Sequence, residues 1–168
     1  MATTTPSTGI LSDGKLAERE QLIELLTKAY WMELETVMSY ISNSINPDGI
    51  RAQEIAESLQ QDIQEELGHA QQFGKRIKEL YGVVPGSSEF SAEQSYLQPP
   101  EDQTDLIHIV RGVIEAESGA IEYYNQIIEF CADRDPVTED MVITILADEE
   151  GHRRLFEGFL RELEKDAA

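Results

Sequence analysis

Two short stretches of the chain carry a glutamate three residues before a histidine, and both have the spacing of a metal site. The first pair is Glu66 and His69, and the second is Glu149 and His152. On a helix, positions i and i+3 lie on one face about one turn apart. Each glutamate can therefore reach the same ion as its histidine, and a carboxylate with an imidazole suits a divalent transition metal.

Each pair has a further glutamate upstream, and that glutamate is followed by a tyrosine. Glu33 stands 33 residues before the first pair, and Glu117 stands 32 residues before the second. Tyr40 and Tyr124 each follow their glutamate by seven residues. The chain thus repeats one pattern, which supplies four carboxylates and two imidazoles. This is the ligand set of a two-metal site inside a four-helix bundle.

Apolar residues recur at three- and four-residue spacing in four long segments, which predicts four helices. The expected helices span 15–44, 50–81, 104–132 and 136–165. Proline and glycine mark short turns within each pair of helices, so the paired helices should be antiparallel. The segment 82–103 is long enough to cross the bundle, and Ser91 to Gln94 resembles a capping box that predicts a short helix near 88–96.

The predicted fold is therefore all-α: a four-helix bundle of two antiparallel hairpins joined by a long crossover. The repeated motif suggests a pseudo-twofold axis that passes through the metal site at mid-bundle. Residues 1–14, which are rich in Thr and Ser, are predicted to be a flexible arm, and residues 15–168 a single helical domain.

The four motif glutamates fall on the apolar stripes of these helices. A carboxylate in a core is costly unless it is paired or bound to a metal, and two divalent cations would neutralise all four. The neighbours Glu35, Glu65, Glu115 and Glu150 fall off the stripes and are predicted to be solvated. The alternative is a set of core polar residues that satisfy one another without metal.

We predict a specific division of ligands. Glu33 and His69 hold one ion, Glu117 and His152 hold the other, and Glu66 and Glu149 bridge them. Mixed ligands with open positions favour iron or manganese over structural zinc, so two iron ions per chain are expected, with manganese or zinc as replacements. Tyr40 and Tyr124 complete the candidate catalytic set. They either hydrogen-bond a ligand on a neighbouring helix, which is the favoured interpretation, or are core aromatics.

The third histidine and the single cysteine are the other residues that could form a site. His108 lies off the inner stripe and about 14 Å (nine helical residues) from Glu117, so it is interpreted as a surface residue rather than a second metal site. Cys131 is the single cysteine, which excludes an intrachain disulfide and a thiolate metal cluster. It is interpreted as a small core residue.

The charge balance limits the partners. The chain of 168 residues carries 33 acidic and 13 basic residues, for a formal net charge of −20. Nucleic-acid binding is not expected, because phosphate contacts need clustered Lys and Arg. The N-terminal residues show neither a basic start nor an apolar run, so no signal peptide or membrane segment is predicted and the expected location is cytoplasmic.

The motifs resemble those of the ferritin-like superfamily, most closely bacterioferritin and Dps-like proteins with a bacterioferritin-type site. The likeness spans about 22–163, and the family's ligand positions fall on the six metal candidates named above. The resemblance implies a ferritin-like fold, ferroxidase activity on Fe(II) with dioxygen or hydrogen peroxide, iron storage or detoxification, and a hollow homo-oligomeric shell.

The chain departs from that family in three ways. Leu67 stands where bacterioferritins carry the methionine that binds haem, so haem is not expected. Only 16 residues follow His152, too few for the fifth helix of a bacterioferritin, which favours a 12-subunit shell over a 24-subunit one. Typical Dps proteins build their site between subunits, and some relatives add a cysteine pair. This chain carries a complete set of ligands and one cysteine.

Three other functions are compatible with the same motifs. A rubrerythrin-like peroxide reductase shares both repeats, although it usually adds a rubredoxin domain that is missing here. An oxygenase acting on an organic substrate would use the same centre. A non-enzymatic shell or binding protein would have no metal-dependent oxidase activity.

Overall fold

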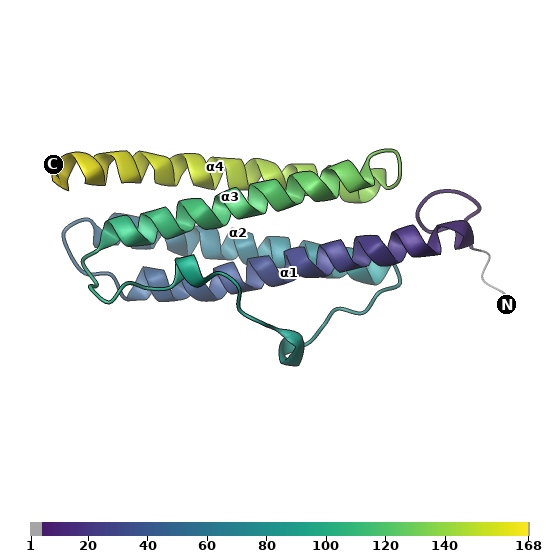
Figure 1. The fold of residues 1–168 in the computed structure, drawn as a ribbon, viewed down its shortest axis with the longest axis horizontal. Coiled ribbons are helices and arrows are strands. Elements are labelled where there is room, and N and C mark those ends of the chain that lie inside the picture. The colour runs from purple at the N-terminus through teal and green to yellow at the C-terminus, as the bar shows by residue number, and fades with distance from the viewer. Residues whose placement is uncertain (1–4, 168) are drawn as a thin grey trace.

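The computed structural model describes residues 5–167, and that range contains four long α-helices and no β-strand. The helices are α1 (Leu16–Ile45), α2 (Ala52–Glu79), α3 (Leu106–Cys131) and α4 (Pro136–Ala167), with short 3-10 helices at Asp13–Lys15, Ser87–Glu89 and Ser95–Leu97. They form two antiparallel hairpins, α1–α2 and α3–α4, packed as one bundle (Figure 1). The predicted all-α bundle is confirmed. None of the helices within the described range combines the length and hydropathy needed to cross a membrane.

Local residues explain where the helices begin and turn. Gly49 adopts a φ of 118° in the α1–α2 turn, a conformation that favours glycine. The carboxylate of Asp105 accepts the backbone N–H of His108 at 3.0 Å and caps α3. Pro136 occupies the first position of α4, where its missing N–H costs no hydrogen bond. These turns hold each hairpin antiparallel, as its short connection predicted.

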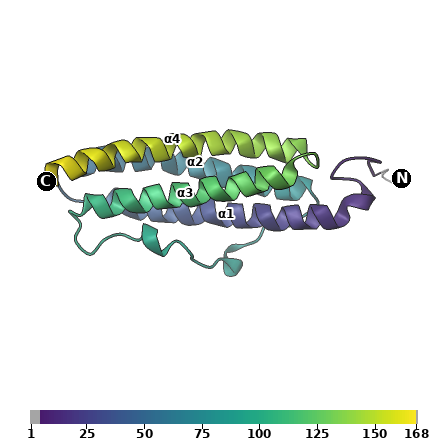
Figure 2. The same cartoon turned by 45° about the horizontal axis from the view of Figure 1, so that its top comes forward.

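The crossover runs along the α1 and α3 side of the bundle (Figure 2). Residues 90–94 are not helical, so the short helix predicted from the capping box is wrong. The backbone N–H groups of Glu93 and Gln94 instead donate to the carboxylate of Glu35 on α1, at 2.7–3.0 Å. The prediction that Glu35 is solvated is also wrong, since it is buried with these partners.

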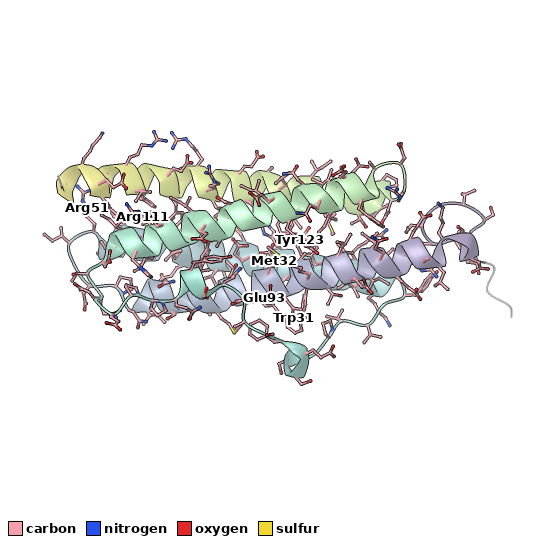
Figure 3. The ribbon with its side chains drawn as sticks, viewed as in Figure 1. Trp31, Met32, Arg51, Glu93, Arg111 and Tyr123 are labelled. Atoms are coloured by element: carbon pink, nitrogen blue, oxygen red, sulfur yellow. The ribbon has the colours of Figure 1, made fainter. Side chains whose placement is uncertain are left out.

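Further contacts fasten the crossover across α1 and α3. Asn43 Nδ2 donates to the carbonyl oxygen of Leu97 at 2.9 Å. Gly112 on α3 allows close approach, because a Cβ there would lie 2.6 Å from a backbone oxygen of the crossover. Trp31 of α1 packs against Phe90 with ring centroids 5.5 Å apart, and Figure 3 shows Trp31 on the crossover side of α1. The crossover is therefore held against this side of the bundle by several separate contacts.

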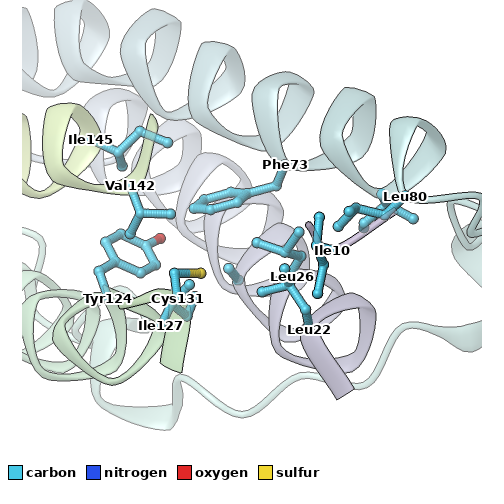
Figure 4. Packing of buried hydrophobic residues seen from close by; sticks show 12 residues of the cluster. Ile10, Leu22, Leu26, Phe73, Leu80, Tyr124, Ile127, Cys131, Val142 and Ile145 are labelled. Carbon is cyan, nitrogen blue, oxygen red and sulfur yellow. The ribbon is translucent and has the colours of Figure 1, made fainter. Parts of the chain in front are cut away.

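Two apolar clusters fill the bundle on either side of its middle. One contains Leu26, Phe73 and Ile145 from three different helices (Figure 4). The other contains Leu59 and Phe156, with residues of α3. The burial of these side chains removes large apolar surfaces from water, and each Å² of buried apolar surface stabilises the fold by about 25 cal/mol. The helices are thus fixed at both ends of the segment that carries the motif glutamates.

The N-terminal residues pack in part against the first cluster. Ile10 is buried there, and its carbonyl oxygen accepts a hydrogen bond from the Arg19 guanidinium at 3.3 Å. Residues 1–4 of the predicted flexible arm lie outside the described residues. The flexibility of residues 1–14 therefore stays a prediction.

A buried ion pair fixes the α3–α4 turn to the end of α2. Arg76 Nη2 donates to both carboxylate oxygens of Asp135, at 2.8 and 3.0 Å. Arg76 Nε donates to Thr138 Oγ1 at 2.8 Å. Because the guanidinium and the carboxylate both have partners inside the protein, this cluster is complete without a ligand.

Candidate metal centre

Each of the four helices brings one motif glutamate to the middle of the bundle. The six predicted ligands are all buried, with exposed fractions of 1–8%: Glu33, Glu66, His69, Glu117, Glu149 and His152. They lie on the inner stripes between the two apolar clusters. The sequence spacing thus places all six in one small volume.

The six residues form two overlapping groups whose ligand atoms lie within 4.8 Å of one another. One group is Glu33, Glu66, His69 and Glu149, and the other is Glu66, Glu117, Glu149 and His152. The two glutamates of the Glu-x-x-His motifs belong to both groups. This is the division predicted from the sequence, although metal binding by these residues stays a prediction.

The imidazoles face the shared carboxylates through Nδ1. His69 Nδ1 lies 3.1 Å from Glu149 Oε1 and 3.5 Å from Glu66 Oε2. His152 Nδ1 lies 3.4 Å from Glu66 Oε1 and 3.4 Å from Glu149 Oε2. Both bridging candidates therefore have one oxygen near each histidine, as a two-ion site requires.

Unpaired polar atoms show how well these residues fit a pair of cations. Within residues 5–167, Glu66 Oε1, both carboxylate oxygens of Glu149 and the Nδ1 atoms of His69 and His152 are buried without a hydrogen-bond partner. Buried polar atoms in this state are costly. Two divalent cations would satisfy them and balance four carboxylates, and oxygen and imidazole donors suit iron or manganese.

The tyrosines connect the two hairpins. Tyr40 of α1 donates its hydroxyl hydrogen to Glu117 of α3, and Tyr124 of α3 donates to Glu33 of α1. Each tyrosine thus holds the carboxylate that the other hairpin contributes, which is the contact that the sequence favoured. Burial, followed by the negative charge of the partner carboxylate, raises the pKa of both phenols well above the ordinary value.

Two acidic residues on the outer side of the histidines were missed in the sequence. Glu65 Oε2 lies 3.0 Å from His152 Nε2, and Asp148 Oδ2 lies 3.2 Å from His69 Nε2. Glu65, which was predicted to be solvated, is exposed but makes this contact. A signal was present, because the glutamate of each Glu-x-x-His motif directly follows an acidic residue. These contacts fix the ring orientation that turns Nδ1 toward the centre.

Asp62, one turn before Glu66 on α2, is the third missed acid. It is only 4% exposed, and its Oδ1 lies 3.8 Å from His152 Nε2. Burial raises the pKa of Asp62 to about 6. The repeat gave no signal for it, because the equivalent position on α4 is the apolar Ile145.

The pKa values of the central residues indicate how the site is protonated in the absence of cations. Burial, then the charges of Glu66 and Glu149, raise the pKa of Glu33 and of Glu117 well above the ordinary value. Burial lowers the pKa of His69, but the adjacent carboxylates of Glu149 and Glu66 outweigh it and raise the pKa to about 10. The metal-free centre therefore retains protons that bound cations would displace.

The remaining candidates lie away from the centre. His108 is exposed, with Nε2 3.1 Å from the carbonyl oxygen of Gln98. Cys131 is buried in the first apolar cluster, and burial raises the pKa of its thiol to about 12. A neutral, enclosed thiol is a core residue rather than a nucleophile.

Comparisons with known proteins agree with this architecture. Residues 23–166 match the Ferritin family, described as a ferritin-like domain. The chain is 32% identical to the DNA protection during starvation protein of Pyrococcus furiosus over 146 residues, covering 84% of this chain and 77% of that protein. It is 27% identical to the bacterioferritin of Desulfovibrio desulfuricans over 140 residues, covering 83% and 74%. A solved dodecameric thioferritin, the bacterioferritin-related protein from Bacteroides fragilis, has the same fold, with a TM-score of 0.78, 23% identity and 89% of each chain covered.

Proposed function

The chain belongs to the ferritin-like domain family, and from that premise we propose that it is a ferroxidase that stores or detoxifies iron. Fe(II) is its substrate, and the six buried carboxylate and imidazole residues are its oxidation site. The relatives named bacterioferritin and DNA protection during starvation protein support this assignment. The fit of the unpaired buried atoms to two cations is the observation that carries it.

The proposed division of ligands follows the two groups of side chains. Glu33 and His69 hold one ion, Glu117 and His152 hold the other, and Glu66 and Glu149 bridge them. Two Fe(II) ions give two electrons, which with two protons reduce one dioxygen to hydrogen peroxide, or one hydrogen peroxide to two waters. The apolar clusters on both sides keep bulk water away from this volume.

Storage requires a closed assembly, and we propose a homo-oligomeric shell of 12 subunits. The solved dodecameric relative supports that size. The net charge of −20 gives such an assembly a strong attraction for cations. The proposed location is the cytoplasm, and neither haem, nucleic acid nor membrane is a proposed partner.

Aerobic loading with a large excess of Fe(II), followed by size-exclusion chromatography, tests this function. Iron and protein are quantified in each fraction. We expect many more than two irons per chain to co-elute with a large assembly. About two irons per chain on a small oligomer would contradict storage, and peroxide turnover would then test the rubrerythrin-like alternative, a peroxide reductase without a rubredoxin domain.

A further inference from the structure

A cavity of about 400 Å³ lies between α1 and the crossover. Ile23, Trp31 and Met32 of α1 give it apolar walls, and Ser91 and Glu93 line it from the crossover. Figure 3 shows Trp31, Met32 and Glu93 on this side of the bundle. Ligand sites are typically cavities of about 300–1,000 Å³ with mainly apolar walls and a few polar groups. The cavity is therefore large enough for a small organic molecule, and the proposed oxidation of Fe(II) makes no use of it.

The walls of this cavity favour a flat ligand. Trp31 packs against Tyr30 and against Phe90 of the crossover, with ring centroids 5.0 and 5.5 Å apart. Because Trp31 is only half-buried and lines the cavity, part of its indole is available to a ligand. Aromatic rings attract one another in offset-stacked and edge-to-face arrangements, and the sulfur of Met32 contacts aromatic rings favourably. A planar molecule would gain both kinds of contact here.

The charges around the cavity disfavour anionic ligands. Lys28 is the one basic residue among the described residues that line it, and its ammonium lies over the ring of Tyr123, 5.0 Å from the ring centroid. A site lined mainly by one sign of charge repels ligands of the same sign. Nucleotides and other phosphate-bearing cofactors therefore fit poorly, and an uncharged molecule fits better. The acidic lining residues are Glu24, Glu35, Glu89 and Glu93.

Two adjacent tyrosines of α3 connect this cavity to the metal centre. Tyr123 lies against Lys28 at the cavity, and its ring centroid is 6.5 Å from that of Tyr124. Tyr124 donates its hydroxyl hydrogen to Glu33, which is a proposed iron ligand. The first hairpin has no equivalent pair, because Ser39 precedes Tyr40 where Tyr123 precedes Tyr124. Neighbouring aromatic rings mediate electron transfer, so the pair offers a route between the cavity and the Glu33 side of the centre.

We propose that the cavity binds an uncharged, planar hydroquinone, which delivers electrons through Tyr123 and Tyr124 for the release of stored iron. The delivery role rests on the proposed storage function, whereas the binding site does not. One hydroquinone becomes a quinone by giving up two electrons and two protons. The two electrons reduce two Fe(III) ions to two Fe(II) ions, and the two protons pass to the solvent. A two-electron donor thus matches a centre that is proposed to hold two irons.

Trp31 is the single tryptophan of the chain, so its fluorescence reports on this cavity directly. The full-length protein without iron is titrated with duroquinone, an uncharged planar quinone that has no open ring position for attack by a thiol. We expect quenching that saturates in the wild type. Ser91→Phe, which places a ring in the cavity from the crossover, should raise the Kd about tenfold or more, because it takes the space of the ligand.

Ser88→Phe is the matched control, since it makes the same change three residues earlier at an exposed position that does not line the cavity. It should keep the wild-type Kd. Quenching that rises linearly without saturation would refute the site. An equal Kd in the wild type and in Ser91→Phe would refute it as well, because the quinone would then bind elsewhere.

Iron release tests the delivery of electrons. Iron-loaded protein is mixed with durohydroquinone below its Kd without oxygen, and Fe(II) is trapped by ferrozine. Ser88→Phe should release iron at the wild-type rate, and Ser91→Phe about tenfold more slowly, in proportion to its Kd. Tyr123→Leu should keep the Kd for duroquinone and also release iron more slowly. Oxidation of Fe(II) by Ser91→Phe should equal that of the wild type.

Dithionite, a small reductant that needs no planar site, should release iron equally from every variant and so show that each one holds reducible iron. Equal release by durohydroquinone from the wild type and Ser91→Phe would contradict delivery from the cavity. A wild-type rate in Tyr123→Leu would refute the route through the tyrosines. If the wild type stores no iron, the proposed storage function and the delivery role both fail, whereas the quenching of Trp31 still decides whether the cavity binds a quinone.

Discussion

Two buried charged clusters of this protein differ in what they lack. Around Arg76, the guanidinium reaches both oxygens of Asp135 and the hydroxyl of Thr138. At the centre, both oxygens of Glu149 and one oxygen of Glu66 have no hydrogen-bond partner among the described residues. In the first cluster, the protein's own side chains supply the hydrogen-bond partners. In the second cluster, added cations would have to supply the missing contacts.

This difference distinguishes buried charges that stabilise the fold from buried charges that bind a ligand. A complete ion pair contributes to the fold by itself, and removal of one partner leaves a buried charge unpaired. An incomplete cluster of acids destabilises the metal-free fold, and the binding of cations to it increases the free energy of unfolding. Variants and conditions that affect one cluster should therefore leave the other unchanged.

The largest effect is expected at the complete cluster. Arg76→Met leaves Asp135, which is 1% exposed, without its cation. The free energy of unfolding should fall by about 3–5 kcal/mol, with or without Mn(II), as measured by urea denaturation. Arg76→Met with Asp135→Asn should recover part of the loss. A loss that Mn(II) repairs would contradict the separation of the two clusters.

The next effect concerns the incomplete cluster. Mn(II) at a hundred times its Kd should raise the free energy of unfolding of the wild type by about 2.7 kcal/mol. Glu149→Gln should abolish most of this rise and reduce the Fe(II) oxidation rate by at least about a hundredfold, because both proposed ions lose a ligand. Without metal the same variant should be at least as stable as the wild type. Glu150→Gln, next to it but exposed, is the control and should resemble the wild type.

The two clusters should also differ in how their contribution to stability depends on pH. Without metal, burial lowers the pKa of both histidines, but the adjacent carboxylates of Glu149 and Glu66 outweigh burial. They raise the pKa of His69 from 6.5 to about 10 and that of His152 from 6.5 to about 12. A raised folded-state pKa gives stability that is present below the unfolded pKa and is lost as pH rises toward the folded pKa. The metal-free protein should therefore lose stability as pH rises from 6.5 to 10.

Cation binding should show the opposite trend in the same window. Bound imidazoles must be neutral, so the Mn(II)-induced rise in Tm should increase with pH. The raised pKa of Glu33 and of Glu117 acts in the same direction as the histidines. The loss caused by Arg76→Met should stay constant between pH 6.5 and 10. Calorimetry of the wild type and of Arg76→Met across this pH range measures both effects. If the two clusters were coupled, the loss caused by Arg76→Met would change with pH.

The sequence was informative where the chemistry repeats and uninformative where it does not. Glu66 and Glu149 could be assigned because helical phase and repetition agree on their position. Glu35 was misassigned, since its partners at 93 and 94 lie 58 and 59 residues away and no local pattern shows them. Asp62 was missed because its equivalent is Ile145. Periodicity thus locates the helices and the paired ligands, whereas single contacts between distant segments need the structure.

The smallest effect is expected at the tyrosines, which support the incomplete cluster from outside. Tyr124 donates to Glu33 and is fully buried. Tyr124→Phe keeps the ring and removes that donor, so Glu33 is held less firmly against its ion. Mn(II) affinity should fall about tenfold, the lower end of what such supporting contacts contribute.

Tyr123→Phe is the matched control, because the Tyr123 hydroxyl donates to the carbonyl oxygen of Leu25 instead of to the centre. It should lose a hydrogen bond worth about 1 kcal/mol of stability and keep its Mn(II) affinity. Equal losses of affinity in the two variants would mean that general loosening of α3 explains the result. A loss confined to Tyr124→Phe would show that a neutral phenol, itself no ligand, helps an incomplete set of carboxylates to hold its cations.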